Sequence, residues 1–381
     1  MVEFQLTPSQ QAYAARVRQV ATETLAPLAA DGVDGRVNRP LLLALGQTGL
    51  LRDLFGGDAG DPDAMRLCLM RESLAQVSGE AETALALQGL GSYPIVLAGE
   101  PGMVRRWIAP VVAGEAVAAF ALSEPKAGSD AAALSLRAER DGDGWRLSGE
   151  KMWISNAPEV DVYTVFARST PGTRSRGVTA FVVAGDSPGL TGEALDMLAP
   201  HPIGRLVFDG VRVGRDAVLG EVDQGFAVAM RTLDVFRPSV GACAIGLAQA
   251  ALDATISYVR KRKVQGGPLA DQQAVRHAIA DLATRLEASR LLVYAAASAI
   301  DGEADPREQS RRSAMAKLFA TESAQAVIDG CVQFHGAVAL QRGHLLEHLY
   351  RDVRALRIYE GASEIQRTII ARELIGRGSS A

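Results

Sequence analysis

A single carboxylate, Glu360, stands directly before Gly361 near the C-terminal end of this 381-residue chain. The glycine provides a flexible joint that can lift the carboxylate off a helix and into a pocket. Apolar neighbours such as Ile358 and Tyr359 would desolvate the carboxylate, which raises its pKa toward neutrality. Such a group can remove a weakly acidic proton from carbon. The alternative role for Glu360 is a helix cap or a solvated charge.

Two segments in the middle of the chain combine polar and aromatic groups. Residues 120–130, FALSEPKAGSD, form a loop whose backbone N–H and hydroxyl groups can hydrogen-bond a heteroaromatic ring or a phosphate. In residues 149–156, GEKMWISN, the aromatic Trp153 offers a flat face and Ser155 a hydrogen bond. Each segment alone also fits a plain turn or a core strand. Their occurrence in one β-rich region favours a site for a planar cofactor.

The composition is that of an ordinary soluble protein, with 48% hydrophobic and 22% charged residues. A net charge of -4 without a block of like charges gives no footprint for nucleic acid. We find no signal peptide and no membrane-spanning run, so we expect a cytoplasmic protein without membrane insertion. The cysteines Cys68, Cys243 and Cys331 lie far apart and predict buried free thiols, without a disulfide or zinc site.

Common nucleotide and metal motifs give little support to other functions. No GxGxxG follows a predicted strand and no GxxxxGK[ST] occurs, so neither a dinucleotide-binding fold nor a P-loop is indicated. Residues 344–348, HLLEH, match the HxxEH zinc pattern, but no third ligand is dictated. We expect a polar helix face there and no metal.

The pattern of apolar residues divides the chain into helical, β-rich and helical parts. Helices are predicted in the first part, with Ser9 as the first cap, at 9–29, 39–51, 64–78 and 103–113. Strands follow at 134–140, 145–147, 162–167, 178–183 and 206–213, with a hairpin turn at 141–144. Long helices return at 225–262, 271–300, 307–331 and 362–375, where Pro238 kinks the first helix or sets its start. The predicted domains are therefore 1–116, 117–222 and 223–381, mainly α with a central β domain.

Several motifs together resemble the FAD-dependent acyl-CoA dehydrogenase family, in its medium- or short-chain bacterial form. They occur in the family's order and spacing over nearly the whole chain, at 122–130, 151–156, 258–263 with Gly266 and Gln273, Gln333 with Gly336, and 350–367. The resemblance implies an N-terminal helical domain, a middle β-barrel or sandwich and a C-terminal four-helix bundle.

The resemblance also implies FAD between the β domain and the bundle. The flavin ring would contact Phe120, Leu122, Ser123, Gly128, Ser129, Trp153, Ile154 and Ser155. The pyrophosphate and adenosine of an FAD held mainly by a neighbouring subunit would contact Arg262, Gln273, Gln333, Gly336 and Ala337, and Ala362 and Glu364 would border the cofactor. A site shared between subunits implies an obligate oligomer, in this family usually a homotetramer.

By the same resemblance, Glu360 removes the α-proton of an acyl thioester while the β-hydrogen leaves as hydride to flavin N5, giving a trans-2-enoyl thioester. The thioester carbonyl is polarised by a ribityl hydroxyl of FAD and the N–H of the base. Some members carry the base near 234–237, where this chain has Phe236 and no Glu. Four residues match positions that line the acyl-pantetheine channel, or are satisfied polar groups: Ser129, Asp234, Arg237 and Gly361.

The chain departs from the family pattern at cofactor and carrier contacts, namely at Gln265, Ala337, Ala339, Leu340, Ala362 and the loop 198–205.

Four functions are candidates for this chain. The first is dehydrogenation of a short or medium acyl-CoA with electrons passing to an electron-transfer flavoprotein. The second takes an acyl chain bound to a carrier protein, in a biosynthetic pathway. The third is an oxygen-using acyl-CoA oxidase or monooxygenase, and the fourth is a scaffold that has lost FAD.

Overall fold

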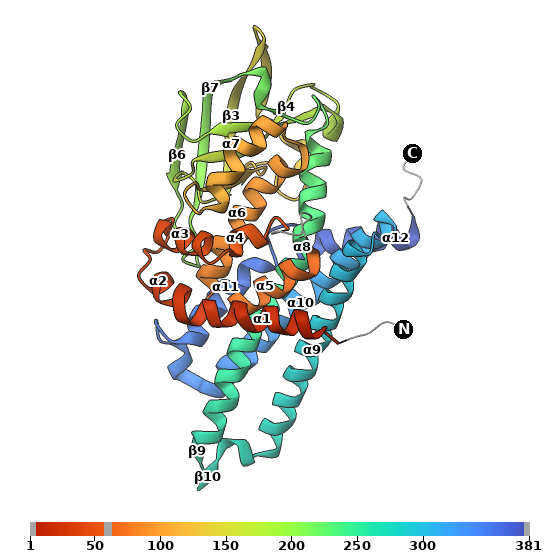
Figure 1. The fold of residues 1–381 in the computed structure, drawn as a ribbon. Helices are drawn as coiled ribbons and strands as arrows, with labels where there is room; N and C mark the ends of the chain where they lie inside the picture. Colours follow the sequence, from red (N-terminus) through yellow and green to blue (C-terminus); the bar gives the residue numbers. More distant parts are fainter. Residues whose placement is uncertain (1–4, 57–62, 377–381) are drawn as a thin grey trace. The chain divides into compact units, whose positions relative to one another are not determined.

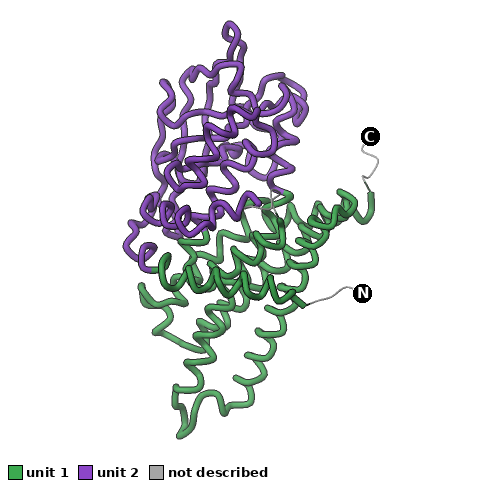
Figure 2. The backbone as a smooth tube through the Cα atoms, in the orientation of Figure 1, with its two compact units in different colours: residues 1–26, 63–82, 234–381 green, residues 27–62, 83–233 purple. Residues whose placement is uncertain are grey.

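The computed structural model describes residues 5–56 and 63–376, which form two compact units (Figure 2). One unit, called unit 1 here, comprises residues 1–26, 63–82 and 234–381, and unit 2 comprises 27–62 and 83–233. The predicted N-terminal helices therefore contribute to both units. The boundaries 1–116, 117–222 and 223–381 stay a prediction.

Unit 2 contains an eight-stranded sheet with strand order β6-β7-β3-β2-β4-β5-β8, in which β1 pairs with β4. Figure 1 labels β3, β4, β6 and β7 of this sheet. The strands are β1 Ala118–Ala121, β2 Arg137–Asp141, β3 Gly144–Ser155, β4 Val162–Arg168, β5 Val178–Ala184, β6 Leu190–Ala194, β7 Ile203–Val213 and β8 Val218–Leu219. The predicted hairpin is confirmed, because Asp141 pairs with Gly144 across its turn. Strand β3 is longer than predicted, since two register shifts against β7 interrupt its alternation of buried and exposed residues.

The helices that lie in unit 2 include α3 Arg39–Gln47, α4 Leu50–Asp53, α7 Pro101–Val112, most of α2 Ala26–Ala30 and most of α6 Gly79–Ala98. Helix α6 was not predicted, because residues such as Gly91 and Pro94 in its second half are unfavourable inside a helix. Gly91 lets α6 approach the sheet closely, because a Cβ there would lie 2.5 Å from the backbone nitrogen of Ala119. Gln88 fixes the same helix to the chain entering β1, donating to the carbonyl of Ala116 at 2.6 Å and accepting from the N–H of Ala118 at 2.8 Å.

Unit 1 is helical. Its helices include α1 Pro8–Val20, α5 Ala64–Ala75, most of α8 Gly225–Lys261, α9 Gln273–Asp301, α10 Pro306–His335, α11 Leu345–Leu356 and α12 Ser363–Ile375. The cap predicted at Ser9 is wrong, because Thr7 caps α1 in a reciprocal pair of hydrogen bonds with Gln10. Pro238 lies inside α8, so it does not set the start of that helix.

The core of unit 1 is built largely from small residues of α8, α9 and α10, such as Ala248, Ala296 and Ala320. All three cysteines are buried and free, as predicted. Helix α8 is long and apolar enough to cross a membrane by length and composition, but most of its apolar stretch is buried within the protein, as in core helices.

The two histidines of the HLLEH motif take part in the structure of α11. The Nδ1 atom of His344 accepts a hydrogen bond from the N–H of Leu346 at the start of the helix. The Nε2 atom of His348 lies 2.9 Å from a carboxylate oxygen of Glu80 and 3.0 Å from one of Asp352. Within the residues that the structure describes, no cluster of three metal-ligating side chains occurs.

The free energy of unfolding is expected to depend on His348 between neutral and alkaline pH. Hydrogen bonds to Asp352 and Glu80 raise the pKa of His348 to about 10. A raised histidine pKa stabilises the fold fully below about pH 6.5, and this contribution is lost as the pH rises toward about 10. We expect His348→Gln to lower stability by about 1 kcal/mol at pH 6, measured by urea unfolding, and by much less at pH 10. An equal loss at both pH values would contradict this.

Candidate active site

Glu360 lies in the short connection between α11 and α12, and the backbone there adopts an unusual conformation. The φ angles of Glu360 and Gly361 are +51° and +93°, so two consecutive residues are left-handed. For a residue other than glycine this conformation is unfavourable. The turn carries Glu360 off the end of α11, and the residue is neither fully buried nor fully exposed.

The two oxygens of this carboxylate differ in their surroundings. The Oε2 atom is buried and accepts no hydrogen bond from the residues that the structure describes. Burial raises the pKa of Glu360, and Glu82 adds to the rise, while the cations Arg71, Lys317 and Arg237 oppose it. The pKa stays above its ordinary value on balance, so the carboxylate is a stronger base than an exposed one. An orphaned acceptor with a raised pKa is ready to receive a proton.

A buried ion pair lies among the groups that act on Glu360. Arg71 on α5 pairs through Nε with a carboxylate oxygen of Glu82 on α6, and the two side chains are 3% and 1% exposed. The Nη1 atom of Arg71 also donates to the hydroxyl of Ser239 on α8 at 2.7 Å. One guanidinium therefore connects α5, the first turn of α6 and α8 within unit 1.

Arg237 and Asp234, both predicted to bind substrate, lie near one another on α8. The Nη1 atom of Arg237 is 2.5 Å from a carboxylate oxygen of Asp234. Arg237 is buried, and its Nε atom has no hydrogen-bond partner in the described part of the chain. Phe236 between them is buried too, and it stands at the alternative position of the base that the resemblance implies. Gly361 belongs to the same unit, whereas Ser129 belongs to unit 2.

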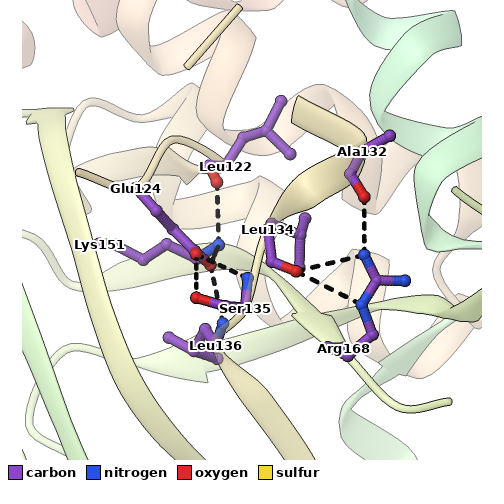
Figure 3. A network of polar contacts seen from close by, with 8 residues as sticks. All are labelled: Leu122, Glu124, Ala132, Leu134, Ser135, Leu136, Lys151 and Arg168. Carbon is purple, nitrogen blue, oxygen red and sulfur yellow. Dashed lines mark hydrogen bonds and ion pairs between the residues drawn. The ribbon is translucent and has the colours of Figure 1, made fainter. Parts of the chain in front are cut away.

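In unit 2, the loop that begins at Leu122 is fixed by a buried Lys–Glu pair (Figure 3). The ammonium of Lys151, on β3, donates to the carbonyl of Leu122 at 2.8 Å and to Glu124 at 2.9 Å. Glu124 also accepts from the backbone N–H groups of Ser135 and Leu136, at 2.6 and 2.9 Å. Burial of the ammonium lowers the pKa of Lys151 to about 8, although Glu124 opposes the change. The network holds the predicted flavin loop against the strand that leads to Trp153.

Trp153 is the most open of the predicted flavin contacts with large side chains. It is 49% exposed and has a φ of +57°, although its neighbours Lys151 and Ile154 are buried. The N–H of Met152 donates to the carbonyl of Ser123 at 3.0 Å, so this strand and the loop lie side by side. An exposed indole beside a loop of small polar residues fits a planar ring such as the flavin of FAD.

The other predicted ring contacts in unit 2 divide into exposed and buried residues. Gly128 and Ser129 are exposed, and Leu122 and Ile154 are buried. Phe120 and Ser123 are intermediate, and the Phe120 ring packs on Phe166. The hydroxyl of Ser155 is hydrogen-bonded to Nε2 of His201 at 3.0 Å. Burial lowers the pKa of His201 to about 4, so this ring is neutral at physiological pH.

The residues predicted to contact adenosine and pyrophosphate all lie in unit 1. All five are exposed: Arg262, Gln273, Gln333, Gly336 and Ala337. Of the two residues predicted to border the cofactor, Glu364 is exposed and Ala362 is intermediate. The C-terminal ends of α8 and α10 meet near Arg262, Gln333 and Gly336, where Tyr258 stacks on His335 with ring centroids 4.0 Å apart. Exposed basic and amide groups at this end are available to a ligand outside the described chain.

Sequence reasoning missed several groups around these residues, among them Arg71, Glu82, Lys317, Glu124, Lys151 and His201. One signal was available for two of them. Arg71 and Lys317 each fall on the apolar stripe of a predicted helix, with Leu74 and Ala320 one turn further on. A charge on such a stripe is rarely buried unless it is paired, and the partners could not be read from the sequence.

The chain matches three family models in succession: the N-terminal domain of acyl-CoA dehydrogenase over residues 7–115, the middle domain over 119–211 and the C-terminal domain over 223–375. It is 34% identical to cyclohexane-1-carbonyl-CoA dehydrogenase of Geobacter metallireducens, over 94% of this chain and 95% of that protein. It is 37% identical to the CarC subunit of the caffeyl-CoA reductase–Etf complex of Acetobacterium woodii, over 84% of each chain.

Among solved structures, a glutaryl-CoA dehydrogenase of Mycobacterium smegmatis in complex with FADH2 is similar, with a TM-score of 0.89 and 26% identity, over 99% of this chain and 97% of that one. The fold is thus that of FAD-dependent oxidoreductases acting on CH–CH donors. The chain belongs to the acyl-CoA dehydrogenase family.

Proposed function

We propose that this protein dehydrogenates the Cα–Cβ bond of an acyl-CoA, with Glu360 as the base that removes the α-proton. The observation that carries the proposal is the Glu360 carboxylate, which has a buried oxygen without a hydrogen-bond donor and a pKa above its ordinary value. Such surroundings favour uptake of a proton by the carboxylate, which is what a general base requires. The buried Phe236 leaves no carboxylate at the alternative position of the base on α8.

Each group of residues has a separate task in this proposal. The exposed Trp153 and the loop 120–129 hold the flavin ring of FAD, and Lys151 with Glu124 fixes that loop. Bound FAD supplies the acceptor for the β-hydride. Glu360 receives the α-proton at a carboxylate oxygen, and the N–H of the same residue polarises the thioester carbonyl. Arg237 and Asp234 line the channel for the acyl-pantetheine chain, together with Ser129 and Gly361.

The adenosine half of FAD completes the proposal. The exposed residues Arg262, Gln273, Gln333, Gly336 and Ala337 bind the pyrophosphate and adenosine of an FAD that is held mainly by a neighbouring subunit, and Ala362 and Glu364 border the cofactor. A guanidinium such as that of Arg262 can bind phosphate oxygens in a bidentate manner. The protein would then act as a homotetramer in the cytoplasm, with an electron-transfer flavoprotein as the electron acceptor.

The test of this function is anaerobic reduction of the purified flavoprotein. Acyl-CoA thioesters of increasing chain length and branching are added in turn, and loss of the oxidised flavin absorbance is followed. Bleaching by one or more short or medium acyl-CoA thioesters is expected. Bleaching by acyl groups on a carrier protein alone would overturn the choice of CoA thioesters, and rapid peroxide formation in air would overturn the choice of electron acceptor. A protein that binds no FAD would overturn the proposal as a whole.

The indole of Trp153 is expected to contribute directly to FAD affinity. Aromatic stacking contributes about 0.5–1.5 kcal/mol, so Trp153→Ala should raise the Kd for FAD by up to about tenfold. Reconstitution of apoprotein with FAD, followed by flavin fluorescence, measures the change. Met197→Ala is the matched control, since Met197 is also an exposed apolar side chain of unit 2 but lies outside both flavin segments. Equal Kd values for wild type and Trp153→Ala would contradict the assignment.

A further inference from the structure

Two side chains donate hydrogen bonds to the backbone of the turn that carries Glu360. The ammonium of Lys317, on α10, donates a hydrogen bond to the carbonyl of Gly361 at 2.8 Å. The amide of Gln366, on α12, donates to the same carbonyl at 2.8 Å and to the carbonyl of Glu360 at 3.3 Å. Both side chains are buried at 0% exposure. The left-handed turn is therefore fixed by one charged and one neutral donor.

We propose that Lys317 is a positioning residue for Glu360. The hydrogen bond of Lys317 holds the turn at Gly361, and its positive charge keeps the Glu360 carboxylate available as a base. This inference rests on the proposed function, because it gives Lys317 a role only if Glu360 accepts a proton. It assigns Lys317 no contact with substrate or with FAD.

A neutral donor would be enough if the turn needed only a hydrogen bond. Gln366 already supplies such a donor to the carbonyl of Gly361. Burying an ammonium is costly, and here the burial lowers the pKa of Lys317 to about 8. A buried charge therefore calls for an electrostatic reason besides the hydrogen bond. The nearby carboxylates that favour the charged form are Glu360, Glu322 and Glu364, and the cation Arg237 opposes it.

Glu360 itself lies among three cations, and they differ in how far their own partners neutralise them. Arg71 is paired with Glu82, and Arg237 is paired with Asp234. In the described part of the chain, the hydrogen bond of the Lys317 ammonium is made to a neutral backbone carbonyl. Its charge is thus the least compensated of the three by a direct carboxylate partner. Lys317 lowers the pKa of Glu360 together with Arg71, whose influence is larger, and Arg237, whose influence is smaller. Glu82 is the acidic group that acts in the opposite direction.

The conformation of the turn gives the hydrogen bond a second role. A left-handed residue other than glycine costs roughly 1–2 kcal/mol, and Glu360 has a φ of +51°. Gly361 has little room for change, because a Cβ there would lie 2.5 Å from the amide nitrogen of Gln366. Lys317 and Gln366 therefore keep the carboxylate in place by restraining the backbone and not by contacting the side chain.

The test separates the charge of Lys317 from its hydrogen bond. The holoprotein is titrated between pH 4 and pH 8, and the infrared carboxyl band of Glu360 is identified by its absence in Glu360→Gln. Lys317→Met and Lys317→Gln are each expected to raise the midpoint by about one pH unit, since a nearby opposite charge favours ionisation. Gln366→Met removes the neutral donor to the same carbonyl and is the matched control, with the midpoint unchanged.

A midpoint that is unchanged in both Lys317 variants would overturn the inference, as would an equal shift in Gln366→Met. If neither Lys317→Met nor Lys317→Gln yields folded holoprotein, Lys317→Arg decides, because it retains the charge. Its midpoint should equal that of wild type, and a rise of one unit would overturn the role of the charge. Failure of the proposed function is separate: it is seen when Glu360→Gln is reduced normally by butyryl-CoA, whatever the Lys317 variants do.

Discussion

Glu360→Gln is expected to lower the rate of flavin reduction by an acyl-CoA substrate by about a thousandfold, within the range for loss of a general base. The amide has the shape of the carboxylate but cannot accept a proton. The buried Oε2 atom of Glu360 has no donor in the described chain, so the substitution breaks no hydrogen bond at that atom. FAD content and the flavin spectrum should therefore stay as in wild type. Anaerobic stopped-flow absorbance of the flavin measures the rate.

The control for this prediction is a surface carboxylate of unit 1. Glu308, on α10, pairs with Arg312 at a site where both side chains are partly exposed. Glu308→Gln should bind FAD and be reduced at the wild-type rate. A fast reduction of Glu360→Gln would show that another group removes the proton. Loss of FAD from the variant would show instead that Glu360 has a structural role.

Arg71→Met is expected to produce the largest loss of stability among single substitutions in this region, about 3–5 kcal/mol. The variant leaves the buried Glu82 without the guanidinium that pairs with it, and Ser239 loses a donor. Leaving one partner of a buried ion pair uncompensated is far more costly than replacing both. The double variant Arg71→Met/Glu82→Leu should therefore recover much of the loss. Urea unfolding of the four proteins in this double-mutant cycle measures the coupling.

A surface pair gives the comparison for this cycle. Arg312→Met removes a partner of Glu308 where the side chains are 45% and 37% exposed, and the expected loss is at most about 1 kcal/mol. If Arg71→Met were no more destabilising than Arg312→Met, the buried pair would contribute no more than a surface pair. A double variant less stable than Arg71→Met alone would contradict the account based on an uncompensated carboxylate.

The sequence predicted the helical and β-rich regions well where the apolar pattern is regular. Strands β4 and β5 and helices α8, α9 and α10 lie close to the predicted ranges, and the mainly α fold with a central β domain is confirmed. The prediction failed where the apolar residues do not follow the period of a helix or a strand. Helix α6 carries two glycines and a proline in its second half, and edge strand β6 has mostly exposed residues, so neither shows the expected periodicity.

For the site, the sequence predicted which residues to examine but not what surrounds them. Glu360 and Trp153 were found from their own neighbours in the chain, and their roles stay predictions. Lys317 lies 44 residues from the carbonyl it binds, and Arg71 lies 168 residues from Ser239. Contacts at such separations depend on how helices pack, which periodicity cannot specify. The cap of α1 is a local difference, because Thr7, two residues before the predicted Ser9, forms the reciprocal hydrogen bonds with Gln10.

The composition of unit 1 from three separate stretches of chain has a consequence for biosynthesis. Residues 63–82 supply Arg71 and Glu82 early, but Ser239 on α8, which accepts from Arg71, and the turn that bears Glu360 leave the ribosome more than 150 residues later. Arg71 and Glu82 can pair with each other early, but the contact between Arg71 and Ser239 forms only after α8 has been synthesised, because a long-range contact needs both of its segments. Truncation anywhere before Glu360 thus removes the proposed base, and truncation before α8 also leaves Arg71 without its contact to Ser239.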